Sequence, residues 1–231
     1  MSERLNIIRK ENAEFEKESP YNFCDRWCER CQHEKQIRCR LYLDDFECRA
    51  TCIAYGRDEN DAEITAKVME KQLDEVEEAM EKLSEETDID FEDLEPDRRN
   101  HNQFVEDNSL DATAKIYLDK AHAFLKDTFY ENKPADPDIQ YDFETVSWYH
   151  MFLQVKLQRA LSGFHEPASD DDYAMHDAVA QFEIAKKSAG ESIKALRNIK
   201  GHFPGHRVQI TALIALLHNI DCRIDALLET I

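Results

Sequence analysis

Six of the seven cysteines in this chain lie within a stretch of 29 residues near the N-terminus. Four follow the pattern C-x3-C-x2-C-x7-C and are Cys24, Cys28, Cys31 and Cys39. Thiolate is a soft ligand, and four thiolates suffice for one tetrahedral zinc ion or one [4Fe–4S] cluster. The pattern therefore predicts a metal centre on these four residues. Cys48 and Cys52 add a C-x3-C pair, which fits further metal ligands, a resolving dithiol or two buried free cysteines.

Three identities of this centre are compatible with the sequence: an iron–sulfur cluster, a zinc ion, or redox-active thiols without metal. The aromatic residues Phe23, Trp27 and Phe46 favour the cluster, because they would form an apolar shell around it. We therefore expect an iron–sulfur cluster first and zinc second. The C-x3-C-x2-C spacing also occurs in radical-SAM enzymes, but their α/β barrel is incompatible with the helical pattern described below.

A second group of candidate ligands is spread over the C-terminal half. Asp119 and His122 are three residues apart, as are His218 and Asp221, so each pair falls on one face of a helix. His150 falls on the apolar stripe of its own helix. Such groups facing the inside of a bundle can hold a di-metal site. An enzyme with this site is a lower alternative, because these helices lack the E-x2-H motif of ferritin-like proteins.

The elements that must position these residues are helices. The 231 residues include only 5 Gly and 6 Pro, and no segment shows a strand pattern. Apolar residues recur at helical spacing over about 59–86, 109–130, 139–164, 170–199 and 210–231. Residues 1–20 are expected to be disordered or a short helix, residues 87–108 a linker, and Cys222 a core residue.

These segments predict an all-α fold with three parts. We expect a small N-terminal cysteine-rich metal-binding module at residues 1–57 and an acidic helix with its linker at 58–108. An antiparallel four-helix bundle would follow at 109–231.

The net charge of −20 is concentrated in one segment, because residues 59–107 carry 19 acidic and 5 basic residues. A surface of this kind repels nucleic acid and anionic membranes. The helix at 59–86 has a narrow apolar stripe: Met69, Leu73, Val76, Met80 and Leu83. Because such a stripe packs against one neighbour only, we expect it to bind a protein partner or to drive self-association.

The sequence has neither a run of about 18 apolar residues nor an apolar signal core at its N-terminus. We therefore expect a cytoplasmic protein. In that compartment clustered cysteines are more often metal ligands or redox groups than disulfides.

Two short segments resemble signatures of an uncharacterised family of bacterial, cysteine-rich helical proteins. The first is Cys24-Asp-Arg-Trp-Cys-Glu-Arg-Cys31 followed by Arg38-Cys39, and the second comprises Trp148-Tyr149-His150, Val155-Lys156 and Arg159-Ala160-Leu161. The gap before Cys39 is longer here than in that family. The resemblance implies a bacterial origin and one linked architecture, without a particular reaction.

The function expected from the sequence is that of a cytoplasmic metal-binding protein with an iron–sulfur cluster for electron transfer or for sensing oxidants or iron. The alternative is a zinc-stapled helical interaction or adaptor protein.

Overall fold

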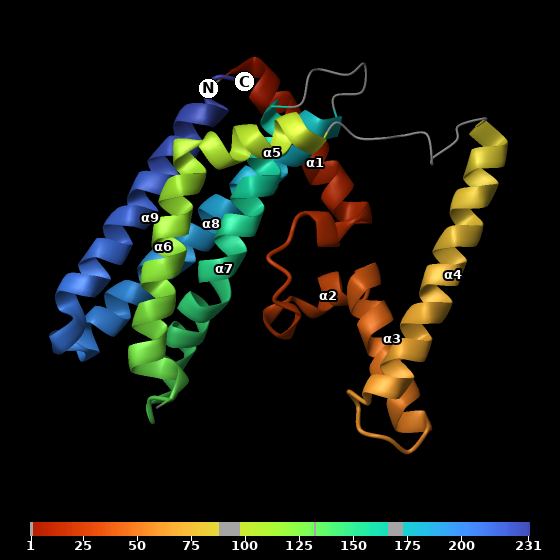
Figure 1. Ribbon diagram of the computed structural model, residues 1–231, viewed down its shortest axis with the longest axis horizontal. Helices are drawn as coiled ribbons and strands as arrows, with labels where there is room; N and C mark the ends of the chain where they lie inside the picture. Colours follow the sequence, from red (N-terminus) through yellow and green to blue (C-terminus); the bar gives the residue numbers. More distant parts are fainter. Residues whose placement is uncertain (1, 88–97, 132, 166–172) are drawn as a thin grey trace. The chain divides into compact units, whose positions relative to one another are not determined.

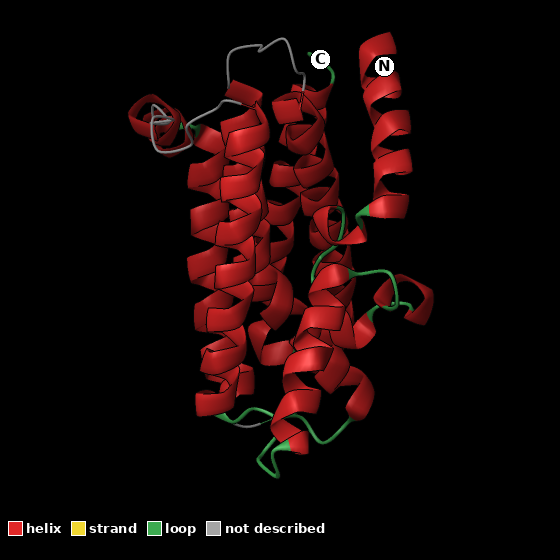
Figure 2. Ribbon diagram, turned by 90° about the vertical axis from the view of Figure 1, so that its right-hand side faces the viewer, coloured by secondary structure: helices red, strands yellow, loops and turns green. Residues whose placement is uncertain are grey.

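The computed structural model of this chain describes residues 2–87, 98–131, 133–165 and 173–231. These residues form helices, turns and loops without any β-strand, which confirms the all-α prediction (Figure 2). No helix among them is long and apolar enough to cross a membrane. The α-helices are α1 Glu3–Glu18, α2 His33–Gln36, α3 Arg40–Ala54, α4 Ala62–Thr87, α5 Arg98–Asp107, α6 Ser109–Leu125, α7 Pro137–His165, α8 Tyr173–His202 and α9 Arg207–Leu228 (Figure 1).

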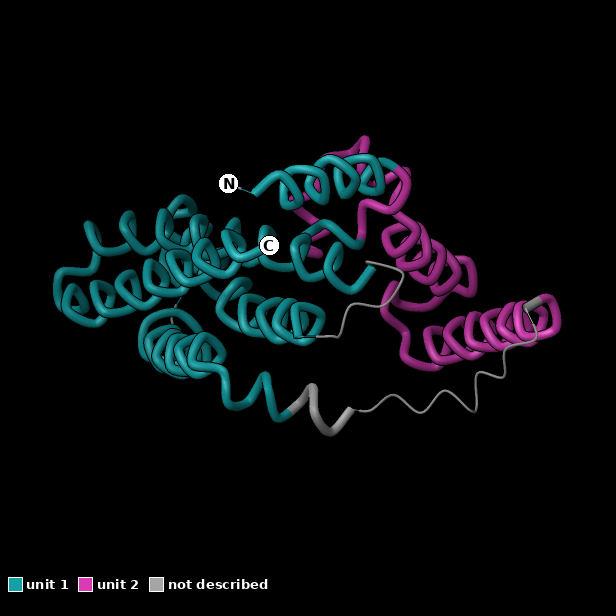
Figure 3. The backbone as a smooth tube through the Cα atoms, turned by 90° about the horizontal axis from the view of Figure 1, so that it is seen from above, with its two compact units in different colours: residues 1–17, 22–25, 98–231 teal, residues 18–21, 26–97 magenta. Residues whose placement is uncertain are grey.

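The chain divides into two compact units (Figure 3). The bundle unit comprises residues 1–17, 22–25 and 98–231, and the cysteine unit comprises residues 18–21 and 26–97. The segment 22–25 thus belongs to the bundle unit although it lies inside the cysteine-rich stretch. The boundaries of the three predicted parts differ from those of these two units, and the three-part division stays a prediction.

The core of the bundle unit lies between α6, α7, α8 and α9, which run side by side (Figure 1). The predicted stripe of α9 is buried over most of its length, with Ile210, Leu213, Leu217, Ile220 and Ile224 all 0% exposed. Its last two members, Leu227 and Ile231, are half-buried. The predicted stripes of α7 and α8 are likewise buried, apart from a half-buried Met175. These helices therefore hold together by burying one continuous apolar face each.

Small residues let α7 and α8 approach closely. Ala178, Ala185 and Ala189 of α8 are fully buried. Beside Ala178, a Cβ built on Gly163 of α7 would lie 2.7 Å from the carbonyl oxygen of Ala174. Only glycine fits at this position without a shift of the backbone.

Helix α5 departs from the sequence prediction, whereas α1 matches one of the two predicted alternatives, a short helix. The predicted linker contains α5, whose Val105 is only 8% exposed and packs in the bundle core. The N-terminal segment forms the 16-residue helix α1, because Leu5 and Ile8 are buried in the same core. The Asn12 side chain also donates to the His176 carbonyl of α8 over 2.9 Å.

Cys222 lies on the outer face of α9 and is exposed, so its prediction as a core residue was wrong. The physical reason is its position two residues from both Ile220 and Ile224. Two residues turn a helix by about 200°, which places Cys222 on the face opposite the buried stripe.

The cysteine unit is built on a hairpin of α3 and α4. Gly56 ends α3 with a φ of +70°, and the amide of Arg57 donates to the Cys52 carbonyl over 3.0 Å. This is a Schellman arrangement, which favours glycine at the left-handed residue. Asp61 then caps α4 by accepting from the Glu63 and Ile64 amides over 3.1 Å each.

Few apolar residues of the cysteine unit are buried. In its described part, the buried large apolar or sulfur-bearing side chains are Trp27, Cys39, Cys52 and Ile64. The stripe of α4 remains exposed, with fractions from 46% at Met80 to 66% at Leu73. This unit therefore lacks a core comparable to that of the bundle.

Candidate functional site

The Cys28-Glu-Arg-Cys31 segment folds into one tight turn. Residues Cys28–Arg30 form a 3-10 turn, and the Cys31 amide donates to the Cys28 carbonyl over 3.2 Å. The Gln36 side chain donates to that same carbonyl over 2.7 Å, which ties the turn to α2. Both thiols are half-buried. C-x2-C is a ligand spacing that occurs both in structural zinc sites and in iron–sulfur sites, so the local backbone suits a pair of metal ligands.

Cys39 lies at the start of α3. It occupies the N-cap position and is 8% exposed. The unpaired amides of a helix N-terminus attract negative charge, including that of a thiolate bound to a metal. Cys39 is therefore well placed to be a ligand, despite the longer gap that precedes it in the sequence.

Cys48 and Cys52 lie one turn apart on α3 and both approach Thr65 of α4. Their sulfur atoms are 3.7 Å and 4.0 Å from the Thr65 hydroxyl oxygen. The Cys52 thiol is fully buried and also donates to the Asp61 carbonyl over 3.9 Å. On one helix, Cβ atoms four residues apart are about 5–6 Å from each other, which is too far for a disulfide without unwinding the helix. The reduced pair thus bridges the two helices of the hairpin.

Cys24 is followed by Asp25, which several hydrogen bonds hold inside the bundle unit. We call Asp25 the anchor. The Asp25 carbonyl accepts a hydrogen bond from the Trp148 indole over 3.0 Å. The Asp25 carboxylate accepts from the Tyr149 hydroxyl over 2.7 Å and from Lys187 over 3.2 Å. Hydrogen bonds to an ionised carboxylate are stronger than neutral ones, so these contacts hold the backbone beside Cys24 firmly.

Gln181 of α8 organises a polar network on the other side of Cys24. Its amide is fully buried, accepts from buried Lys156 over 2.7 Å and donates to the Asn22 carbonyl over 3.3 Å. The same amide donates to Asp177 over 2.9 Å, and Asp177 accepts two hydrogen bonds from Arg159 at 2.7 and 2.8 Å. A buried amide that is satisfied at both ends specifies one arrangement of its neighbours.

The two sequence signatures therefore meet inside the bundle unit. Asp25 belongs to the first signature, and its partners Trp148 and Tyr149 belong to the second. Lys156 and Arg159 of the second signature hold the network around Gln181. The sequence pattern did not predict these contacts, although all of these residues except Gln181 belong to one or other of the two signatures.

The predicted four-cysteine centre is divided between the two units, because Cys24 belongs to the bundle unit and the other three to the cysteine unit. In the described ranges, no three Cys, His, Asp or Glu side chains gather where they could hold one metal ion. The predicted aromatic shell is incomplete as well, since Phe46 is 57% exposed while Trp27 is buried. The donor chemistry fits a thiolate centre, and metal binding would have to draw the thiols together.

The predicted histidine and aspartate site is only partly assembled. The rings of His122 and His150 lie with their centroids 5.9 Å apart. His218 instead lies 3.3 Å from an Arg197 nitrogen, Asp221 lies 3.9 Å from Lys186, and Asp119 is exposed on α6. Of the five residues, the bundle thus brings two together.

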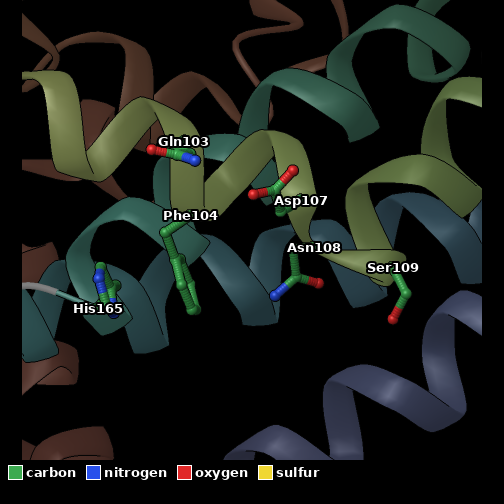
Figure 4. A pocket seen from close by; sticks show the side chains of 6 residues that line it. All are labelled: Gln103, Phe104, Asp107, Asn108, Ser109 and His165. Atoms are coloured by element: carbon green, nitrogen blue, oxygen red, sulfur yellow. The ribbon is translucent and has the colours of Figure 1, made fainter.

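A pocket that the sequence did not predict lies where α5 meets α6 and the end of α7. Figure 4 shows its lining: Gln103, Phe104, Asp107, Asn108, Ser109 and His165. The rings of Phe104 and His165 stack at 3.8 Å. Asn108 caps α6 by accepting from the Leu110 amide over 2.9 Å, and Arg223 donates to the Ser109 carbonyl over 2.8 Å. Several of its polar groups thus serve the start of α6.

No protein-family model matches this chain, and comparisons with curated proteins and with solved structures gave no match.

Proposed function

We propose that this chain is a cytoplasmic metal-binding protein whose cysteines ligate an iron–sulfur cluster for electron transfer or for sensing oxidants or iron. The observation that carries the proposal is the tight turn at Cys28 and Cys31, closed by its 3.2 Å backbone hydrogen bond. Cys39 at the start of α3 supplies a third thiolate. Cys24, held beside the Asp25 anchor, is the fourth ligand of the proposed centre.

The scarcity of buried apolar residues in the cysteine unit supports a metal. Small modules that cannot build a sufficient hydrophobic core generally depend on disulfides or metals. The seven cysteines of this chain are not joined in disulfides. A metal that draws the thiols together would supply folding free energy that the described core of this unit does not. The finer architecture that we propose is a small metal-binding module, an acidic helix and an antiparallel four-helix bundle.

The test is to purify the full chain without oxygen and to measure its visible spectrum, iron, sulfide and zinc on one sample. A brown protein with equal amounts of iron and sulfide supports the proposal, and Cys28→Ser and Cys31→Ser should then abolish the colour. The matched control is Cys222→Ser, because that thiol is exposed on α9. A colourless protein that carries neither iron nor sulfide contradicts the proposal, whether or not it contains zinc.

A zinc-stapled adaptor is the second candidate, and the exposure of Phe46 and of the α4 stripe favours it. Helix α4 carries nine acidic and three basic residues. Each of its lysines lies within 4.0 Å of a glutamate one turn away, which leaves six acidic side chains in excess. A second acidic copy would be repelled. The chemistry of this surface therefore favours a basic amphipathic helix as its partner.

This second candidate is tested with a synthetic helical peptide that carries a leucine stripe and lysines. We expect it to bind the full chain, and we expect Leu73→Ala with Met80→Ala to weaken binding at least about tenfold. The matched control is Val208→Ala, because this exposed valine lies in the bundle unit. Failure of the peptide to bind, or equal binding to the stripe variant, contradicts the adaptor.

A further inference from the structure

His150 of α7 is a buried histidine with one unused nitrogen. Its side chain is 2% exposed, and its Nδ1 lies 2.7 Å from the Ser147 carbonyl oxygen. A carbonyl can only accept, so Nδ1 carries the hydrogen and Nε2 carries a lone pair. Nε2 is buried and has no hydrogen-bond partner among the residues that the structure describes. A buried acceptor without a partner is costly, which suggests that something else occupies this place.

The protonation state of His150 suits a metal ligand. Burial lowers the pKa of His150, the hydrogen bond with Ser147 opposes this shift, and the nearby His122 adds to it. The imidazole is therefore neutral at neutral pH. A neutral imidazole whose other nitrogen donates to a backbone carbonyl is the form in which proteins present histidine to metals.

A second imidazole lies beside it. The ring of His122, on the exposed side of α6, has its centroid 5.9 Å from that of His150, with 23° between the ring planes. The ring of Tyr130 lies next to His122, with 5.8 Å between the two ring centroids. Its hydroxyl oxygen lies 3.3 Å from that of Ser147. Tyr130 ends the π-helical turn Lys126–Tyr130 that continues α6. Such π-turns occur frequently at functional sites.

The separation of the two rings fits one shared ion. With a metal–nitrogen distance near 2 Å, an ion lies roughly 3 Å from a ring centroid, so two rings that share it are at most about 6 Å apart. The observed 5.9 Å falls at the outer end of this range. At this separation the two nitrogens would approach the ion from nearly opposite sides, and the exposed His122 ring would have to turn one of its nitrogens toward Nε2 of His150.

We propose that His122 and His150 form a two-imidazole site for a divalent transition-metal ion of the zinc, nickel and copper group. Imidazole ligands suit these ions. With only two protein ligands, the remaining positions of the ion are open to water or to a small ligand from solvent. The site uses none of the cysteines as ligands and does not depend on the function proposed for them.

The test is nuclear magnetic resonance on the full chain with 15N-labelled histidine, using Zn²⁺ as the probe. The cysteines are first loaded with zinc, and more Zn²⁺ is then added. Before this addition, we expect His150 to show the tautomer protonated on Nδ1. The added ion should shift the Nε2 signal of His150 and one nitrogen of His122, and leave the other seven histidines unchanged.

The decisive variant is His122→Ala, because an exposed residue can be removed without disturbing the core, as circular dichroism would verify. We expect its Zn²⁺ affinity at this site to fall at least about tenfold. The matched control is His202→Ala, since the exposed His202 also has Nδ1 near a helix carbonyl, that of Asn198 at 3.1 Å. An unshifted His150 signal, or equal affinity in His122→Ala, overturns the inference. A cysteine unit that binds no metal leaves this readout intact.

Discussion

The bundle unit and the cysteine unit are both helical, yet they differ in how they use apolar residues. In the bundle unit, Leu213 and Leu217 of α9 are fully buried. In the cysteine unit, Leu73 and Val76 occupy the same kind of stripe on α4 and are 66% and 49% exposed. A periodic stripe therefore specifies which face of a helix is apolar, and it does not specify whether that face is covered.

This difference bears on what stabilises each unit. The bundle unit buries complete apolar faces of four long helices and can fold through the hydrophobic effect. The cysteine unit buries little in its described part and contains five of the seven cysteines. We therefore propose that packing stabilises the bundle unit and that metal ligation stabilises the cysteine unit.

The largest change in stability that we expect comes from a pair of substitutions, one in each unit, that tests this comparison. Leu157→Ala should destabilise the protein by about 2–5 kcal/mol, because it empties a fully buried position of α7. Leu73→Ala on α4 should change stability by less than about 0.5 kcal/mol. Urea unfolding measures both values. Equal costs at the two positions would show that the α4 stripe is covered in solution.

Gly163→Ala should also be costly, by about 1–3 kcal/mol, because its Cβ would meet the Ala174 carbonyl oxygen at 2.7 Å. The matched variant is Gly190→Ala on α8, where no atom lies within 4 Å of the added Cβ. That variant should instead gain up to about 1 kcal/mol through helix propensity. Thermal unfolding of both variants measures whether each substitution stabilises or destabilises the protein. A stabilising Gly163→Ala would refute the close approach of α7 and α8.

Tyr149→Phe should destabilise the bundle unit by about 1–2 kcal/mol, because it removes a hydrogen bond to the Asp25 carboxylate. The control is Tyr173→Phe, which changes an exposed tyrosine at the start of α8. A double-mutant cycle with Asp25→Ala isolates the coupling in urea unfolding. Additive effects of Tyr149→Phe and Asp25→Ala would mean that the hydrogen bond between these two side chains does not stabilise the protein.

The smallest expected effect is a pH dependence in the bundle unit. Burial raises the pKa of Asp142 above its usual 3.8, while a hydrogen bond with Asn198 opposes this shift. The folded state thus holds the proton more tightly, so its contribution to stability is present below pH 3.8 and lost as the pH rises through the folded pKa. Since the group is partly exposed, solvent screening keeps the effect below about 1 kcal/mol.

Asp142→Asn should therefore stabilise the protein slightly at pH 7, and this gain should disappear at low pH. Unfolding in urea at several pH values measures it. The control is Asp119→Asn at an exposed position of α6. A gain for Asp142→Asn that does not change with pH would contradict the raised pKa.

The sequence predicted most of the bundle, because its helices obey local periodicity. The stripes from Ile210 to Ile224 and from Phe143 to Leu161 are buried as expected. Local rules failed for α5 and did not decide between a short helix and disorder for α1. Their few apolar residues, such as Val105 and Leu5, became informative only once the core was formed. Tertiary packing overrode a weak local signal in both cases.

The candidate site was less predictable, because its contacts join residues far apart in the chain. Asp25 and Tyr149 are 124 positions apart, and no periodicity links them. Spacing did identify the turn at Cys28 and Cys31, since that turn is local. Four thiols can reach one ion only through contacts between residues far apart in the chain. The spacing of the cysteines does not specify such contacts.

The central claim is that metal ligation stabilises the cysteine unit, whereas a hydrophobic core stabilises the bundle unit. Amide hydrogen exchange of the full chain, with its metal bound and after removal by a chelator, tests this most directly. We predict that metal removal accelerates exchange at least about tenfold in α2 and α3 and leaves α6, α7, α8 and α9 unchanged. Equal exchange in α2 and α3 with and without metal would contradict the account.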